Sequence, residues 1–309
     1  MGELPEQTPY LEWENSVYGN GVEEDRICQD CHMPHGGQLT PRSPFAQHHF
    51  VGGNTFMLKI LQGRMEELAL TSSSDHFAAT IGRTMNQLQS NTAEVTILEA
   101  TIQEDSVKIL VNIENTAGHK FPTGFPSRRA WVHLVLKDST GQILFESGKP
   151  LPDGSLMGDD ADVDFLTCEP HYDVISRPDQ VQIYQSVMQN SDGEVAYTLL
   201  RGASYVKDNR LLLEGFDKSK VMEHVAVYGA AVNDENFTGG SDLVQYVIDL
   251  EGASGPFTVT GELLYQSISS SFMQDLSADS TKLVDRFIGF YNDADRSPVV
   301  IAMVEKTVE

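Results

Sequence analysis

The stretch Ile27-Cys28-Gln29-Asp30-Cys31-His32-Met33-Pro34 places two cysteines two residues apart and a histidine directly after the second cysteine. This spacing is typical of covalent haem attachment. Two thiols so close together can add to the vinyl groups on one edge of a haem, and the next residue is then held beneath the iron. The pattern therefore predicts haem c on Cys28 and Cys31, with His32 as the proximal ligand.

Two other interpretations of the cysteine pair fit its spacing less well. A zinc ribbon needs a second pair of ligands, and the chain has only one other cysteine, Cys168. His35 could complete a set with Cys28, Cys31 and His32, but tetrahedral zinc needs longer spacing between its pairs. A thioredoxin-type dithiol begins a helix after a strand, whereas a helix and a polar turn precede this pair. Haem attachment is the interpretation that the spacing favours.

The composition limits the kinds of partner. The chain has 309 residues, and its 45 acidic and 21 basic side chains give a formal net charge of −24. Such a field repels nucleic acid and anionic membranes and favours basic partners. No apolar run is long enough to span a bilayer, and residues 1–20 do not form a signal peptide. Because covalent haem is attached outside the cytoplasm, we expect a periplasmic or extracellular protein whose targeting segment was removed, or the tail of a longer chain.

The first 92 residues are expected to form a helical haem module. Thr8 and Pro9 mark a helix start, and Tyr10, Trp13 and Val17 fall on one face that either lines the haem or packs in a core. A loop of Gly, Pro and Ser follows the cysteine motif and leads to His48 and His49. This loop is long enough to turn around a porphyrin edge, so either histidine can supply the sixth iron ligand, and loop reach favours His48.

The remaining chain, residues 93–309, has the alternation of apolar and polar residues that is typical of strands. The overall fold class predicted is α+β: a small helical haem-binding module followed by an antiparallel β-sandwich-like domain with a late helix. The pattern predicts helices at 54–71, 74–91 and 271–291. The predicted strands cover 95–102, 107–113, 130–136, 143–145, 181–187, 195–200, 221–232, 243–250, 257–264 and 299–304.

Six stretches together resemble one family, the multihaem c-type cytochromes found in the periplasm or outside the cell. The resemblance is to their C-terminal part and covers nearly the whole chain, although those proteins carry several CxxCH motifs and this chain carries one. The stretches are residues 10–13 (YLEW), 28–34 (CQDCHMP), 48–54 (HHFVGGN), 118–129 (GHKFPTGFPSRR), 169–173 (EPHYD) and 207–210 (KDNR).

The resemblance implies electron transfer through haems with two histidine ligands. It implies that His48, in the HxF pattern, and His119, in the GHxFPTG pattern, are axial ligands or haem neighbours. Two such histidines are one too many for one attached haem, so one of them either reaches a haem on polypeptide outside this chain or is a structural residue of a tight turn. Arg128 and Arg129 follow that turn and suit haem propionates, although they can equally relieve an acidic surface.

Three functions fit these observations. The first is an electron carrier, with redox partner proteins or neighbouring haem modules as partners and a possible homo-oligomer as its assembly. The second is a haem oxidoreductase acting on a small nitrogen or sulfur compound, for which residues 171–173 (HYD) are the nearest catalytic candidates. In the third, the β-rich domain is a recognition module that docks the haem module to a partner. An electron carrier is favoured because no catalytic group stands out.

Overall fold

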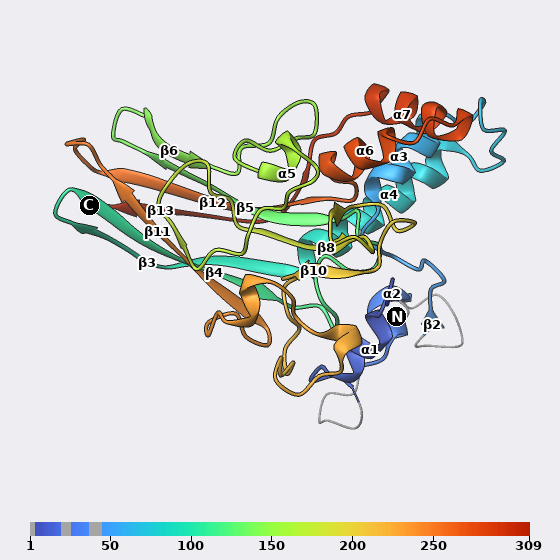
Figure 1. The fold of residues 1–309 in the computed structure, drawn as a ribbon, viewed down its shortest axis with the longest axis horizontal. Coiled ribbons are helices and arrows are strands. Elements are labelled where there is room, and N and C mark those ends of the chain that lie inside the picture. Colours follow the sequence, from blue (N-terminus) through green and yellow to red (C-terminus); the bar gives the residue numbers. More distant parts are fainter. Residues whose placement is uncertain (1–3, 20–25, 37–44) are drawn as a thin grey trace.

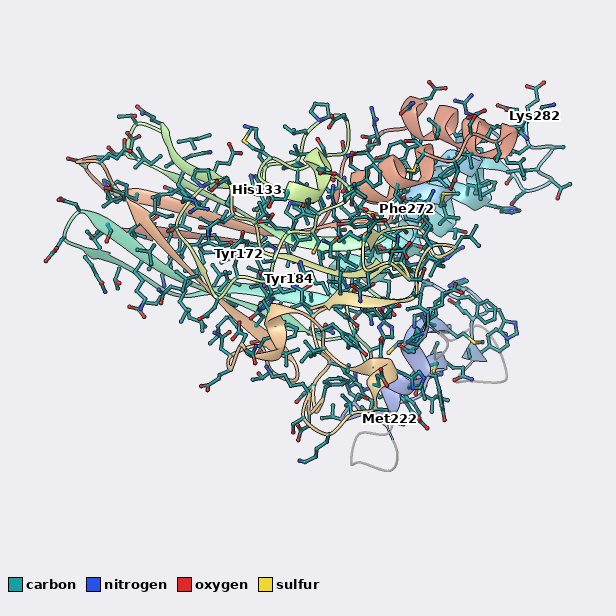
Figure 2. The ribbon with its side chains drawn as sticks, viewed as in Figure 1. His133, Tyr172, Tyr184, Met222, Phe272 and Lys282 are labelled. Carbon is teal, nitrogen blue, oxygen red and sulfur yellow. The ribbon has the colours of Figure 1, made fainter. Side chains whose placement is uncertain are left out.

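The computed structural model describes residues 4–19, 26–36 and 45–309. The chain has the α+β fold that the sequence predicts. Two long sheets form the body, and helices gather at one end of it, with the C-terminus at the opposite end (Figure 1). The side chains are packed throughout the space between the sheets (Figure 2).

Most helices begin at a side chain that caps their N-terminus. Asn54, Ser73, Ser269 and Thr281 each accept a hydrogen bond from the backbone N–H three residues further on. The helices are α1 (Pro9–Glu14), α2 (Cys28–His32), α3 (Thr55–Gly63), α4 (Ser74–Ser90), α5 (Asp160–Val163), α6 (Ser270–Ser277) and α7 (Lys282–Asp293).

The strands form two large sheets, antiparallel except for the parallel pair β7 and β11. The first sheet has the order β3 (Ala93–Gln103), β4 (Ser106–Asn115), β11 (Ser241–Asp249), β7 (Val174–Ile175). The second has the order β10 (Ser204–Asp208), β8 (Ile183–Gln189), β5 (Arg129–Lys137), β12 (Phe257–Gln266), β13 (Val299–Val308), with β6 (Ile143–Ser147) on β5 and β9 (Val195–Ala196) on β8. A separate short pair, β1 (His35–Gly36) and β2 (Phe45–Ala46), follows α2.

Side chains from both sheets meet in one hydrophobic core. Ile109 of β4, Leu134 of β5 and Val259 of β12 are fully buried in it. β11 alternates between buried and partly buried residues, as expected for a strand with one face in the core. β5 is buried along nearly its whole length, because Trp131 on its other face packs in a second cluster with Leu156 and other apolar residues.

Four predicted elements are wrong in detail. The helix expected at 54–71 ends at Gly63, and only Val195–Ala196 of the strand expected at 195–200 is extended. The strand expected at 221–232 is replaced by two 3₁₀ turns, η1 (Glu223–Val225) and η2 (Ala230–Val232). Gly229 has φ of 79°, a left-handed conformation that interrupts an extended chain, and only the bridge from Tyr228 to Asp208 survives as β structure. The single helix expected at 271–291 is broken into α6 and α7.

The N-terminal segments pack directly on the β-rich body. α4 ends at Ser90 and β3 begins at Ala93, so the expected domain border near residue 92 falls at a change of secondary structure. Contacts nevertheless cross that border: the Val17 N–H donates to the Glu214 carbonyl at 2.9 Å, and the Tyr205 hydroxyl donates to the Pro5 carbonyl at 2.9 Å. These contacts fix α1 beside the body.

Candidate functional site

A cavity of about 810 Å³ lies between the N-terminal helices and one end of the sheets. This volume is in the range of sites that enclose a small molecule or a cofactor. Its wall is built from α1, α2, the C-terminal end of α4 and the turn between β4 and β5, together with Tyr265 near the end of β12. Segments from both halves of the sequence therefore surround one space.

Two histidines meet at this cavity. His32 is the last residue of α2, and His119 lies in the turn between β4 and β5. Their ring centroids are 6.1 Å apart, and the ring planes differ by 17°. Two imidazoles on opposite sides of one metal ion, with metal–nitrogen bonds of about 2 Å and each nitrogen about 1 Å from its ring centroid, have centroids about 6 Å apart. The separation of the two rings is compatible with such a shared ion.

The hydrogen bonds of the two rings leave the same nitrogen free in each. Nδ1 of His32 donates to the Val51 carbonyl at 2.5 Å, and Nδ1 of His119 donates to the Lys120 carbonyl at 3.1 Å, because a carbonyl oxygen can only accept. In a neutral imidazole Nε2 then carries a lone pair. A donated bond from the other ring nitrogen to a carbonyl is typical of metal-ligating histidine. Burial lowers the pKa of His119, which favours this neutral form.

The two cysteines of the motif face the same cavity. Cys28 begins α2, and both Cys28 and Cys31 line the cavity together with His32 while remaining exposed to solvent. The Asp30 carboxylate accepts a hydrogen bond from the Ile27 N–H at 2.9 Å, which caps this short helix. All three groups of the CxxCH motif thus open onto one space, as attachment of a single haem requires.

Aromatic side chains of α1 form another part of the cavity wall. Of the face formed by Tyr10, Trp13 and Val17, for which the sequence left both a haem wall and core packing open, Tyr10 and Trp13 line the cavity and Val17 does not. The ring centroids of Tyr10 and Trp13 are 5.7 Å apart. The turn that carries His119 comes very close to them. A Cβ atom at Gly118 would lie 3.4 Å from Trp13 and 3.3 Å from Tyr18, so a larger residue would push the turn away from the cavity.

The structure does not bring His48 to His32. His48 is exposed, and its ring packs against Phe50 with centroids 5.7 Å apart. Among the residues that the structure describes, neither His48 nor His49 lines the cavity. Loop reach made His48 the favoured candidate, but the turn between β4 and β5 places the His119 ring 6.1 Å from the His32 ring. The geometry favours His119 as the partner of His32.

The two arginines after the turn have different surroundings. Arg128 lines the cavity, and its Nη1 donates to the Thr123 carbonyl at 2.6 Å. Arg129 is fully buried elsewhere, with ion pairs to Asp159 at 2.7 Å and Asp162 at 2.9 Å. The expectation that Arg129 contacts a haem propionate is therefore wrong, because its guanidinium is already occupied by carboxylates of the chain. Arg128 remains a candidate.

Four buried charged residues lie behind His119. The Lys120 ammonium pairs with Asp208 at 2.9 Å, and Arg210 pairs with Asp208 at 2.8 Å and with Glu12 of α1 at 3.0 Å. Burial alone would raise the pKa of Asp208, but Arg210 and Lys120 hold it well below its usual range. Two acids and two bases balance in charge, which makes their burial tolerable. We call Glu12, Lys120, Asp208 and Arg210 the buried quartet.

A second group, His171, Asp234 and Asp242, resembles a metal site in composition. Amide groups of Gln182 and Asn209 each donate to Nδ1 of His171 at 2.9 Å. A neutral His171 must then carry its proton on Nε2, which donates to Asp234 at 3.0 Å. Neither ring nitrogen of His171 then has a lone pair left for a metal ion.

The amide orientations at His171 are fixed by their other partners. The Tyr172 N–H donates to the Gln182 carbonyl oxygen at 2.8 Å, and the Gln182 amide also donates to Asp242, as does the Tyr184 hydroxyl (both tyrosines are labelled in Figure 2). Residues 171–173, the catalytic candidates from the sequence, therefore begin with a histidine that belongs to a buried hydrogen-bond network.

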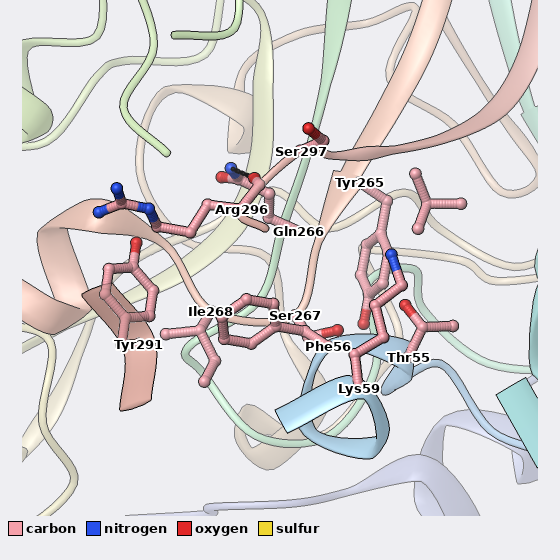
Figure 3. A pocket seen from close by; sticks show the side chains of 11 residues that line it. Thr55, Phe56, Lys59, Tyr265, Gln266, Ser267, Ile268, Tyr291, Arg296 and Ser297 are labelled. Atoms are coloured by element: carbon pink, nitrogen blue, oxygen red, sulfur yellow. Dashed lines mark hydrogen bonds between the residues drawn. The ribbon is translucent and has the colours of Figure 1, made fainter. Parts of the chain in front are cut away.

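A smaller cavity lies near the C-terminal helices (Figure 3). Thr55, Lys59, Tyr291 and Arg296 are among the side chains that surround it, and its volume is about 20 Å³. Such a volume holds about one water molecule. It cannot hold a cofactor.

Sequence reasoning missed Glu12 and Asn115. Glu12 was part of a family-like stretch, but an acidic residue on a short helix is ordinarily solvated. It is instead 0% exposed, on the side of α1 that meets the body. Asn115 ends β4, and its amide donates to the His119 carbonyl at 2.9 Å. The sequence offered no signal for either contact, because both depend on how the turn packs.

Comparison with known proteins supports the fold. No family model and no curated protein matches the chain. Among solved structures it is similar to a penta-heme cytochrome c552 from Thermochromatium tepidum, with a TM-score of 0.51 and 18% sequence identity. The match covers 98% of this chain and 51% of that chain, so this chain spans about half the length of its structural neighbour. Across the described ranges, no helix has the length and apolar character needed to cross a membrane.

Proposed function

We propose that this chain is a c-type cytochrome, or the C-terminal part of a multihaem one, that works in electron transfer. One haem c would be attached to Cys28 and Cys31 and ligated by His32 and His119. The observation that carries this proposal is the pair of imidazole rings, 6.1 Å apart, at a cavity that both cysteines line. The fold similarity to a penta-heme cytochrome supports it independently.

The residues around the cavity suit a one-electron carrier. When bound, a haem supplies an iron that changes between two oxidation states. His32 and His119 would each offer a nitrogen ligand to that iron, so the same two ligands could serve both oxidation states with little rearrangement of the chain. Carbonyls of Val51 and Lys120 fix the two rings through Nδ1. Arg128, at the cavity wall, is the candidate cation for a propionate.

This arrangement disfavours the oxidoreductase alternative. An enzyme acting on a small nitrogen or sulfur compound needs an open iron position, and the His32–His119 pair would occupy both. We therefore propose an electron carrier located in the periplasm or outside the cell, where covalent haem is attached. Its partners would be redox proteins or neighbouring haem modules, in keeping with the length of its structural neighbour.

Mass spectrometry and spectroscopy of protein matured in a bacterial periplasm test the proposal. The protein should carry one covalent haem and give a low-spin spectrum in both oxidation states. The Cys28→Ala/Cys31→Ala double variant should carry none, and Cys168→Ala is the matched control that keeps its haem. Covalent haem in the double variant, or a high-spin parent that binds cyanide or nitrite at once, would overturn the proposal.

A further inference from the structure

We propose that Glu12 is a positioning residue for the iron ligand His119, acting through the peptide group that follows this histidine. This inference rests on the proposed function, because it concerns how one of the two ligands is held. Glu12 touches neither imidazole in the structure. Its role follows from three observations about the peptide group, the carboxylate and the imidazole ring.

The peptide group between His119 and Lys120 is clamped at both ends. Its carbonyl, on His119, accepts a hydrogen bond from the Asn115 amide at 2.9 Å. Its N–H, on Lys120, donates to the Glu12 carboxylate at 3.0 Å. Because a peptide group is planar, two partners on opposite ends fix its orientation. Asn115 comes from the adjacent strand end, whereas Glu12 reaches the turn from α1, 108 positions away.

The carboxylate of Glu12 is itself held rigidly. Its second oxygen accepts from the Thr8 hydroxyl at 3.1 Å and pairs with Arg210 at 3.0 Å. The side chain is 0% exposed. A charged acceptor with three partners in a dry site forms stronger hydrogen bonds than a neutral or solvated one. Glu12 is therefore a hydrogen-bond acceptor for the Lys120 N–H whose position other contacts fix.

The imidazole of His119 depends on the same segment. Its Nδ1 donates to the carbonyl of Lys120, at the next peptide group along the chain. Lys120 is held further by its ammonium, which donates to Asp208 at 2.9 Å and to the Ala226 carbonyl at 3.0 Å. A shift of the Lys120 backbone would turn the ring, so the hydrogen bond from the Lys120 N–H to Glu12 stabilises the orientation of the His119 imidazole at the cavity.

The main test removes the acceptor oxygens while keeping the side-chain volume. In the holoprotein, Glu12→Met should accelerate carbon monoxide binding to the reduced iron by about tenfold, the effect of losing one hydrogen bond to a charged group. The oxidised protein should show a high-spin fraction by electron paramagnetic resonance. Glu12→Gln keeps one acceptor oxygen and should recover most of the parent behaviour.

Two further variants separate positioning from general stability. Val17→Ala shortens a side chain of the same N-terminal segment where it packs beside Gly215 of the body, and it does not alter the contacts of Lys120. It should bind carbon monoxide at the parent rate. His119→Ala should bind it far faster than any Glu12 variant. In the reduced, diamagnetic state, hydrogen exchange of the Lys120 amide should also rise in both Glu12 variants, which provides a second measurement if Glu12→Met folds poorly.

The outcomes distinguish this inference from the proposed function. If His119→Ala opens the iron but the Glu12 variants match the parent in carbon monoxide binding and Lys120 exchange, Glu12 is not a positioning residue and the ligand assignment stands. If His119→Ala remains low spin, the ligand assignment fails and the inference fails with it. If Val17→Ala accelerated carbon monoxide binding as much as Glu12→Met does, Glu12 would have only a structural role.

Discussion

His32 and His119 reach one cavity from regions of opposite character. None of the five residues of α2, all of them described, is buried. The turn of His119 is instead embedded, since Asn115 is 3% exposed, Lys120 0% and Phe121 4%. A ligand beside two covalent attachment points needs little packing, because those bonds would hold it near the iron. A ligand without such a tether must be positioned by the fold.

The largest predicted effect concerns the embedded turn that carries His119. His119→Ala should convert the haem from low spin to high spin almost completely, because no other described imidazole lines the cavity opposite His32. The matched control is His48→Ala, which removes an exposed imidazole and should leave the visible spectrum unchanged. If His48→Ala were high spin and His119→Ala remained low spin, His48 would be the sixth ligand, as loop reach favours.

A smaller effect separates the two arginines that follow the turn. Arg129→Ala should lower the free energy of unfolding by about 3–5 kcal/mol, because it leaves Asp159 and Asp162 buried without their cation. Arg128→Ala loses one hydrogen bond at the cavity and should cost about 1 kcal/mol. Denaturant titration measures both values. Equal losses would contradict the different surroundings of the two side chains.

The last predicted effect concerns the buried hydrogen-bond network around His171, whose members do not line the cavity. Burial lowers the pKa of His171 to about 4 from an unfolded value of 6.5. The unfolded chain therefore binds a proton that the folded chain resists, so the contribution of His171 to the free energy of unfolding should fall by about 2 kcal/mol between pH 7 and 5. Burial raises the pKa of Asp242 to about 7, which acts in the opposite direction over the same range.

Comparison with His171→Gln isolates the histidine contribution, since both proteins keep Asp242. On lowering the pH from 7 to 5, the parent should lose about 2 kcal/mol more than the variant in urea titrations. Parallel pH profiles for the two proteins would show that His171 is protonated as easily in the folded chain as in the unfolded one.

Local patterns predicted most of the fold. The cysteine motif lies on a helix of its own residues, and the strands from 95 to 136 were found because alternation depends only on neighbouring residues. The strand predicted at 221–232 is wrong, since Val225 and Val227 reach the core from turns rather than from a strand. Apolar composition alone does not distinguish these two cases.

The sequence indicated the candidate residues that are neighbours along the chain. It left open those that only folding brings to the cavity. Cys28, Cys31 and His32 are adjacent in sequence, so their shared cavity was expected. His119 was recognised only through a resemblance, and proximity along the chain favoured His48. Arg129 looked like Arg128 from the sequence, and only packing against Asp159 distinguishes the two. Long-range contacts determine these roles, and one sequence does not encode them in a readable pattern.

The separation of the two ligands along the chain has a consequence for folding entropy. In the proposed holoprotein, the bond to His119 would close a loop that begins at the covalently attached haem. A cross-link that closes about 90 residues and stays intact on unfolding restricts the unfolded ensemble by about 4–5 kcal/mol in the chain-entropy description. Where the bond to His119 persists in the unfolded chain, the cofactor would act as a disulfide does, and it would join α2, where no residue is buried, to the turn between the buried residues Asn115 and Lys120.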